Sequence, residues 1–118
     1  MHEYPITCEI ISIAEKYLLE NEKHKTARVK KIRLVVGDMC GYVGESIQMY
    51  FDEIAKDTAC SGAVLEICRV KSKLKCEKCG GLFERKLFSF SCPECGGQGF
   101  PTEIGKEFYI DSIEIERD

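Results

Sequence analysis

Four cysteines in the second half of the chain have the spacing of a metal site. Cys76 and Cys79 form one Cys-x-x-Cys pair, Cys92 and Cys95 form a second, and two glycines follow each pair. Two such pairs supply the four thiolates of a closed tetrahedral zinc site, and iron can occupy a similar shell. We predict structural zinc rather than a catalytic metal, because a closed four-sulfur shell leaves no position for substrate or water.

The first residues of the chain offer a second kind of metal chemistry. The sequence begins Met-His-Glu, so the amine of Met1 and the backbone nitrogen and imidazole of His2 can close fused chelate rings around one ion. Nitrogen-rich square arrangements of this kind suit nickel(II) and copper(II), whereas zinc prefers a tetrahedral site. Taken alone, a Met-His start is more often an incidental histidine than a metal site.

The remaining cysteines are scattered singly among apolar or small residues, and we expect them to be small buried hydrophobes. They are Cys8, Cys40, Cys60 and Cys68. A thiol-redox enzyme is a weaker interpretation of the paired cysteines, because such an enzyme needs an accessible thiolate of low pKa and zinc would occupy these sulfurs.

Length, composition and charge limit the classes of protein. The chain has 118 residues, 44% of them hydrophobic, and a net charge of −3. No apolar run approaches the ~18 residues of a membrane span, and the start lacks the pattern of a signal peptide, so we expect a cytoplasmic protein. Residues 69–95 hold seven basic and three acidic side chains, which partly compensates the charge of four zinc-bound thiolates. The remaining local charge is small, so we do not expect nucleic acid as the partner. The alternative interpretation of the whole chain is a zinc-ribbon module that binds nucleic acid or protein.

Hydrophobic periodicity predicts an α+β fold. Amphipathic helices are expected over residues 7–22, with Thr7 as the N-cap, and 45–56, and strands over 29–36, 63–70 and 107–116. A shift in the apolar phase near Asp111 and Ser112 predicts a β-bulge. We expect a small three-stranded sheet with both helices on one face.

The cysteine-rich stretch interrupts this pattern between its last two strands. We therefore predict that residues 72–100, called the cysteine module below, form a zinc-ribbon-like insert in a domain made of residues 1–71 and 101–118. Phe83, Phe88 and Phe90 are expected to form the small core of the cysteine module.

Several stretches, spread in order over nearly the whole chain, resemble the HypA/HybF family of nickel-insertion accessory proteins for [NiFe]-hydrogenase maturation. They are MHEYPITCEIISIAEKYL, IRLVVGDMCGYVGES, SGAVLEICRV, CEKCGG, CPECGG and IGKEFYIDSIEIE. An MHE start together with a late pair of cysteine knuckles is far more specific than either feature alone.

The resemblance implies a nickel metallochaperone and not an enzyme. It implies nickel as transient cargo at Met1 and His2, with Glu3 contributing to or tuning that site, and structural zinc at the four paired cysteines. The implied partners are a HypB-type nickel GTPase and the hydrogenase large-subunit precursor, and some relatives also serve urease. The sequence leaves open whether the chain is a monomer or a weak homodimer.

Some relatives carry an additional histidine in the zinc module that can approach the nickel. Here the only histidines, His2 and His24, lie outside the cysteine module, which puts such a ligand in doubt. We interpret His24, in the stretch NEKHKT, as a solvated loop residue.

Overall fold

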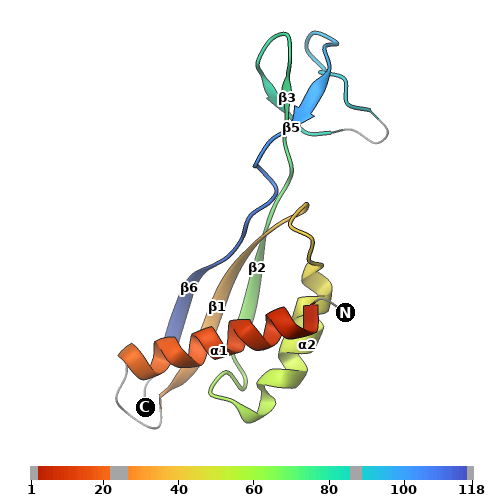
Figure 1. Cartoon of the computed structure of the whole chain (residues 1–118). Coiled ribbons are helices and arrows are strands. Elements are labelled where there is room, and N and C mark those ends of the chain that lie inside the picture. The colour runs from red at the N-terminus through yellow and green to blue at the C-terminus, as the bar shows by residue number, and fades with distance from the viewer. Residues whose placement is uncertain (1–2, 22–26, 86–88, 117–118) are drawn as a thin grey trace.

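The computed structural model describes residues 3–21, 27–85 and 89–116, so Met1, His2, His24 and Phe88 lie outside the described residues. The molecule is elongated, with extents of 59 × 27 × 16 Å. Two three-stranded sheets follow one another along its length (Figure 1). No helix within the described ranges has the length and apolar character to cross a membrane.

The larger sheet has the strand order β2-β1-β6. Its centre is β1 (Arg28–Gly37), which pairs in parallel with β2 (Val64–Val70) and in antiparallel with β6 (Phe108–Glu116). Helices α1 (Glu3–Asn21) and α2 (Gly44–Ile54), the latter continued by the 3₁₀ turn η1 (Ala55–Asp57), lie across one face of this sheet (Figure 1). The predicted α+β arrangement is confirmed.

Strand alternation builds the core between this sheet and the two helices. Ile32, Leu34 and Val36 of β1 are at most 3% exposed and belong to one buried cluster with residues of both helices. The predicted bulge is also confirmed: Arg33 pairs with Ser112 and Leu34 with Ile110, which leaves Asp111 as the extra residue. After the bulge, Ile113 and Ile115 again pack against the core.

The predicted start of the first helix is wrong. Helix α1 begins at Glu3, and Thr7 lies inside it with no exposed surface. Its hydroxyl donates a hydrogen bond to the carbonyl oxygen of Glu3, four residues earlier, which satisfies the hydroxyl within the helix rather than at a cap. Pro5 does not delay the helix, because the backbone N–H that proline lacks is not needed in a first turn.

The smaller sheet has the order β4-β3-β5, with β3 (Leu74–Cys76) between β4 (Leu82–Phe83) and β5 (Gly99–Pro101). Leu74 and Phe83 are buried together with Cys76 and Cys92. The expectation for Phe90 is wrong, because its ring is 46% exposed and lies against the Arg85 guanidinium, 4.9 Å from the ring centroid. Among the described aromatic residues of the cysteine module, Phe83 is the one that is buried. Phe90 instead packs against the Arg85 cation at the surface of the module.

Two connecting segments, residues 71–73 and 102–107, join the sheets and bind each other. The Thr102 hydroxyl donates to the carbonyl oxygen of Lys73 at 2.7 Å. The end of β1 and the turn after it bind the segment 102–107. The Gly37 N–H donates to the Glu107 carbonyl at 2.7 Å, and the Met39 N–H donates to the Gly105 carbonyl at 2.8 Å. The end of β1 therefore sets where the chain leaves the larger sheet.

Candidate metal centres

The four paired cysteines converge in the smaller sheet. Their sulfur atoms all lie within 4.8 Å of one another, and theirs is the only such group of metal-binding side chains among the described residues. The Sγ atoms of Cys76 and Cys95 are 3.3 Å apart, and those of Cys79 and Cys92 are 3.8 Å apart. Four thiolates around zinc at ~2.3 Å would stand about 3.8 Å from one another. The donor set and its spacing therefore fit one tetrahedral ion.

Two equivalent turns bring these sulfurs together. The N–H of Gly80 donates to the carbonyl of Cys76 at 3.0 Å, and the N–H of Gly96 donates to the carbonyl of Cys92 at 2.9 Å. Gly80 and Gly96 have φ of 73° and 74°, a conformation that glycine adopts without the cost of a side chain. The repeated Cys-x-x-Cys-Gly pattern thus has a direct backbone explanation.

Hydrogen bonds prepare part of this site for a metal. The backbone N–H of Cys79, 3.5 Å from Cys76 Sγ, is the main cause that lowers the pKa of Cys76 to about 6. For Cys95 the N–H of Gly97 acts in the same direction, but the hydrogen bond with Cys76, burial and the other thiols outweigh it and raise the pKa to about 11. Metal binding requires thiolates, so a cation bound at these sulfurs would displace the protons that remain on them.

Of the predicted terminal site, Glu3 is the residue that the structure describes. It is the first residue of α1 and only 6% exposed. Its Oε2 accepts a hydrogen bond from the backbone N–H of Val43 at 3.0 Å, and this bond is the main cause that holds the pKa of Glu3 below its usual range. Val43 is the N-cap residue of α2 and has no side-chain cap, so Glu3 supplies the carboxylate that a helix N-terminus favours.

The single cysteines are less uniform than expected. Cys60 has no exposed surface, as predicted, and burial raises its pKa to about 11. Cys8, Cys40 and Cys68 are only partly buried, so the expectation of burial fails for them. Cys40 is held in the turn before α2, where its sulfur accepts the Tyr42 N–H at 3.4 Å.

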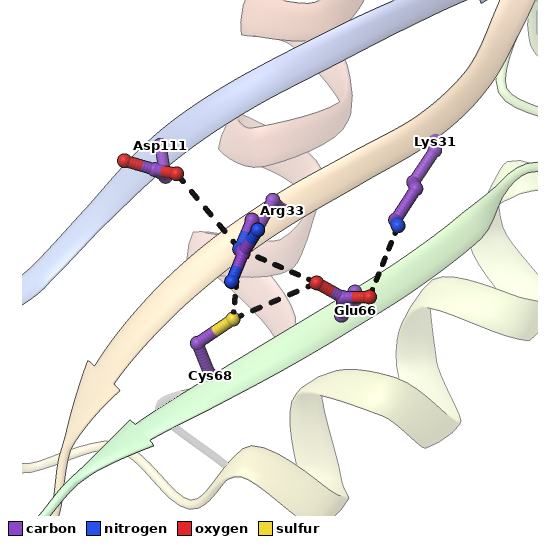
Figure 2. Close-up of polar contacts among 5 residues, drawn as sticks. All are labelled: Lys31, Arg33, Glu66, Cys68 and Asp111. Carbon is purple, nitrogen blue, oxygen red and sulfur yellow. Dashed lines mark hydrogen bonds and ion pairs between the residues drawn. The ribbon is translucent and has the colours of Figure 1, made fainter.

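Cys68 belongs to a charged network on the sheet face that the helices leave open (Figure 2). Its sulfur is 3.1 Å from Arg33 Nε, which is also 3.3 Å from Glu66 Oε1. Lys31 binds the other oxygen of Glu66 at 3.0 Å, and Asp111 lies 3.8 Å from Arg33. Alternation along β2 puts Cys68 on the face opposite the buried Leu65, and this signal was available in the sequence.

Comparisons with known proteins agree over nearly the full chain. The family model described as "Hydrogenase/urease nickel incorporation, metallochaperone, hypA" matches residues 1–115. The hydrogenase maturation factor HypA of Caldanaerobacter subterraneus subsp. tengcongensis is 42% identical over 117 residues, covering 98% of this chain and all of that relative. The corresponding factor of Dehalococcoides mccartyi strain CBDB1 is 37% identical over 116 residues, covering 98% of this chain and 95% of its own.

A solved structure shares the fold. The solution structure of the Ni metallochaperone HypA from Helicobacter pylori superposes with a TM-score of 0.63 at 20% identity, covering 98% of each chain. At this identity the likeness concerns the fold. The family model and the two relatives describe a maturation factor, which confirms the prediction that the chain is not an enzyme.

Proposed function

We propose that this chain, which belongs to the HypA family of metallochaperones, carries nickel(II) to the large-subunit precursor of a [NiFe]-hydrogenase. The observation that carries the proposal is the match of the nickel-incorporation family model to residues 1–115. In this proposal a HypB-type GTPase assists the transfer in the cytoplasm. Urease is a second possible destination, because the family description names both enzymes.

Nickel is the cargo, and we place it at the start of the chain. The amine of Met1 and the amide and imidazole nitrogens of His2 supply a nitrogen-rich set that suits nickel(II). Glu3, the next residue, supports this placement, because its carboxylate fixes the first turn of α1 against the N-terminus of α2 through Val43. In the proposal Glu3 contributes to the nickel site or tunes it, with Oε2 of its carboxylate held by the N–H of Val43.

Zinc has a different role in the proposal. Cys76, Cys79, Cys92 and Cys95 would hold it in a closed shell, and the fit of their spacing to a tetrahedral ion supports this assignment. When bound, zinc would cross-link the two Cys-x-x-Cys turns, which bury few side chains of their own. We accordingly assign nickel binding to residues 1–71 with 101–118, and zinc binding to residues 72–100.

Nickel titration of the zinc-loaded protein tests the terminal site. The His2→Ala variant should lose stoichiometric nickel binding, because it lacks the imidazole donor. A variant with Gly-Ser added before Met1 should lose it too, because the amine of Met1 becomes an amide and the new terminal amine is no longer next to His2. The matched control is His24→Ala, which removes the other histidine and should bind nickel like the unchanged chain. Calorimetry and visible absorption report the binding, while zinc content and circular dichroism report the fold.

Two results would contradict the site. One is undiminished nickel binding by the extended chain, which would move the site away from the amine. The other is loss of nickel binding in His24→Ala with retention in His2→Ala. Either result would leave the family membership untouched and require a different ligand set.

A further inference from the structure

The outer face of the smaller sheet presents a lysine between two large apolar side chains. Lys75 of β3 pairs directly with Leu82 of β4 and with Phe100 of β5. Directly paired residues of antiparallel strands point to the same face, so the three side chains form one row across the sheet, called the Leu-Lys-Phe row below. The opposite face carries Leu74, Phe83 and Cys76, which are buried.

This row is open to solvent. Leu82 is 56% exposed and Phe100 is 48% exposed, and Lys75 is exposed as well. A hollow of about 450 Å³ adjoins the row, lined by Lys75 and Phe100 together with Lys78 and Thr102. Large apolar side chains that are exposed on one face, here on either side of Lys75, and that adjoin a hollow are typical of a surface that another protein covers.

The charge of this surface favours an acidic partner. On the connecting segment 71–73, Lys71 and Lys73 both form ion pairs with Glu84, and the closer one, from Lys73, is 3.0 Å long. For Lys75 and Lys78 no ion pair occurs among the residues that the structure describes. Glu77 is the one acidic residue that lines the hollow, and Cys76 and Cys79 line it too. Lys75, which stands in the row itself, is therefore the side chain that a carboxylate of a partner would meet.

We propose that the Leu-Lys-Phe row docks an amphipathic helix of a partner protein, with apolar residues at positions i and i+7 and a carboxylate between them. Three neighbouring strands place the ends of the row about 10 Å apart. Positions i and i+7 of a helix rise by about 10.5 Å along one face, and i+4 lies between them. The carboxylate meets Lys75, and the two apolar side chains cover Leu82 and Phe100.

The test uses the full-length, zinc-loaded chain and a labelled helical peptide. The peptide is about 18 residues of an alanine-based helix with Leu, Glu and Leu at i, i+4 and i+7, and a second peptide carries Lys in place of Glu. Fluorescence anisotropy should show binding of the Glu peptide. Lys75→Glu should weaken binding of the Glu peptide by about five- to tenfold, the scale of reversing one exposed ion pair. The same variant should bind the Lys peptide more tightly than the Glu peptide.

Matched variants separate docking from general effects of charge and apolar surface. Lys106→Glu makes the same charge change on a connecting segment, and Leu19→Ser removes an apolar side chain that is 79% exposed on α1. Both should bind the Glu peptide like the unchanged chain, whereas Leu82→Ser and Phe100→Ser should weaken it. Zinc content and circular dichroism identify any variant that has lost its fold.

Equal binding of both peptides, or an equal effect of Lys75→Glu and Lys106→Glu, would overturn the proposal. Failure of every variant to change the binding would overturn it too. If a short single-stranded oligonucleotide binds more tightly than the Glu peptide, and its binding depends on Lys75 and Phe100, the partner of this row is nucleic acid and not a helix. None of these outcomes bears on nickel binding, which is measured separately.

Discussion

Replacing Gly37 with alanine should destabilise the join between the larger sheet and the segments that lead to the smaller one. A Cβ atom at this position would lie 2.0 Å from the carbonyl oxygen of Gly105 and 2.9 Å from the backbone nitrogen of Glu107. Both contacts are with backbone, so no side-chain rotation relieves them. The chain at residues 105–107 must move away from the end of β1.

The size of the effect follows from what that movement disturbs. Overpacking of an ordered site costs about 1–3 kcal/mol. The same movement breaks or lengthens the hydrogen bonds from Gly37 to Glu107 and from Met39 to Gly105, now 2.7 and 2.8 Å, and each contributes about 1 kcal/mol. We expect Gly37→Ala to lower the free energy of unfolding by about 3–5 kcal/mol, with zinc content unchanged because the four cysteines lie elsewhere.

Urea unfolding followed by circular dichroism measures this loss through α1 and α2. The control is Gly62→Ala, because Gly62 has φ of 79° and a Cβ there would meet nothing within 4 Å. Its cost is backbone strain alone, about 1 kcal/mol. If Gly37→Ala and Gly62→Ala unfold at the same urea concentration, the close approach at Gly37 does not stabilise the fold as argued.

Three further perturbations address cysteine and glutamate side chains. The double variant Cys79→Ser, Cys92→Ser should lose its zinc and the order of the cysteine module, since small metal modules fold with their ion; full zinc in metal analysis would contradict this. Burial raises the pKa of Cys60 from the ordinary 9.0 to about 11 in the folded chain. The stability that this buried neutral thiol contributes is fully present below pH 9. It is lost between pH 9 and 11, because only the unfolded chain ionises readily there. Urea unfolding across that range should show a loss of about 2 kcal/mol that Cys60→Ala lacks. Glu3→Ala should cost about 1–2 kcal/mol of unfolding free energy, because the N–H of Val43 loses its buried carboxylate partner; an unchanged urea midpoint would show that water replaces it.

The larger sheet was predictable because each of its strands carries a local signal. The expected strand over 29–36 is β1 (Arg28–Gly37), and the expected strand over 107–116 is β6 (Phe108–Glu116). Ile32, Leu34 and Val36 occupy every second position and Arg33 separates the first two, so the face that carries these three had to be buried whatever covered it. The bulge at Asp111 was visible for the same reason, as a break in that alternation.

Features that depend on distant residues escaped this reasoning. The helix start at Glu3 is stabilised by Val43, 40 positions later in the chain, and no local pattern reveals this partner. Phe90 looked like a core residue because its type is apolar, but Arg85 pairs with its exposed ring. For Cys68 we expected burial, although alternation along β2 indicates the face opposite Leu65, and no local pattern shows that Arg33 contacts the sulfur.

The two proposed metal sites stand in different relations to the folded core, and this difference suits their proposed roles. Helix α1 is anchored by Ile10, Ile11, Ala14 and Leu18, which are at most 7% exposed, while Met1 and His2 precede the first residue of that helix. A ligand set placed there, as we propose, would exchange its ion without disturbing those contacts. Cys76 and Cys92, two of the four zinc-site cysteines, are instead buried with Leu74 and Phe83 in the smaller sheet, so release of a shared ion would cost the order of that sheet. In the proposed arrangement, the metal that must be surrendered is held at the start of the chain, and the metal that is kept is held where the smaller sheet folds around it.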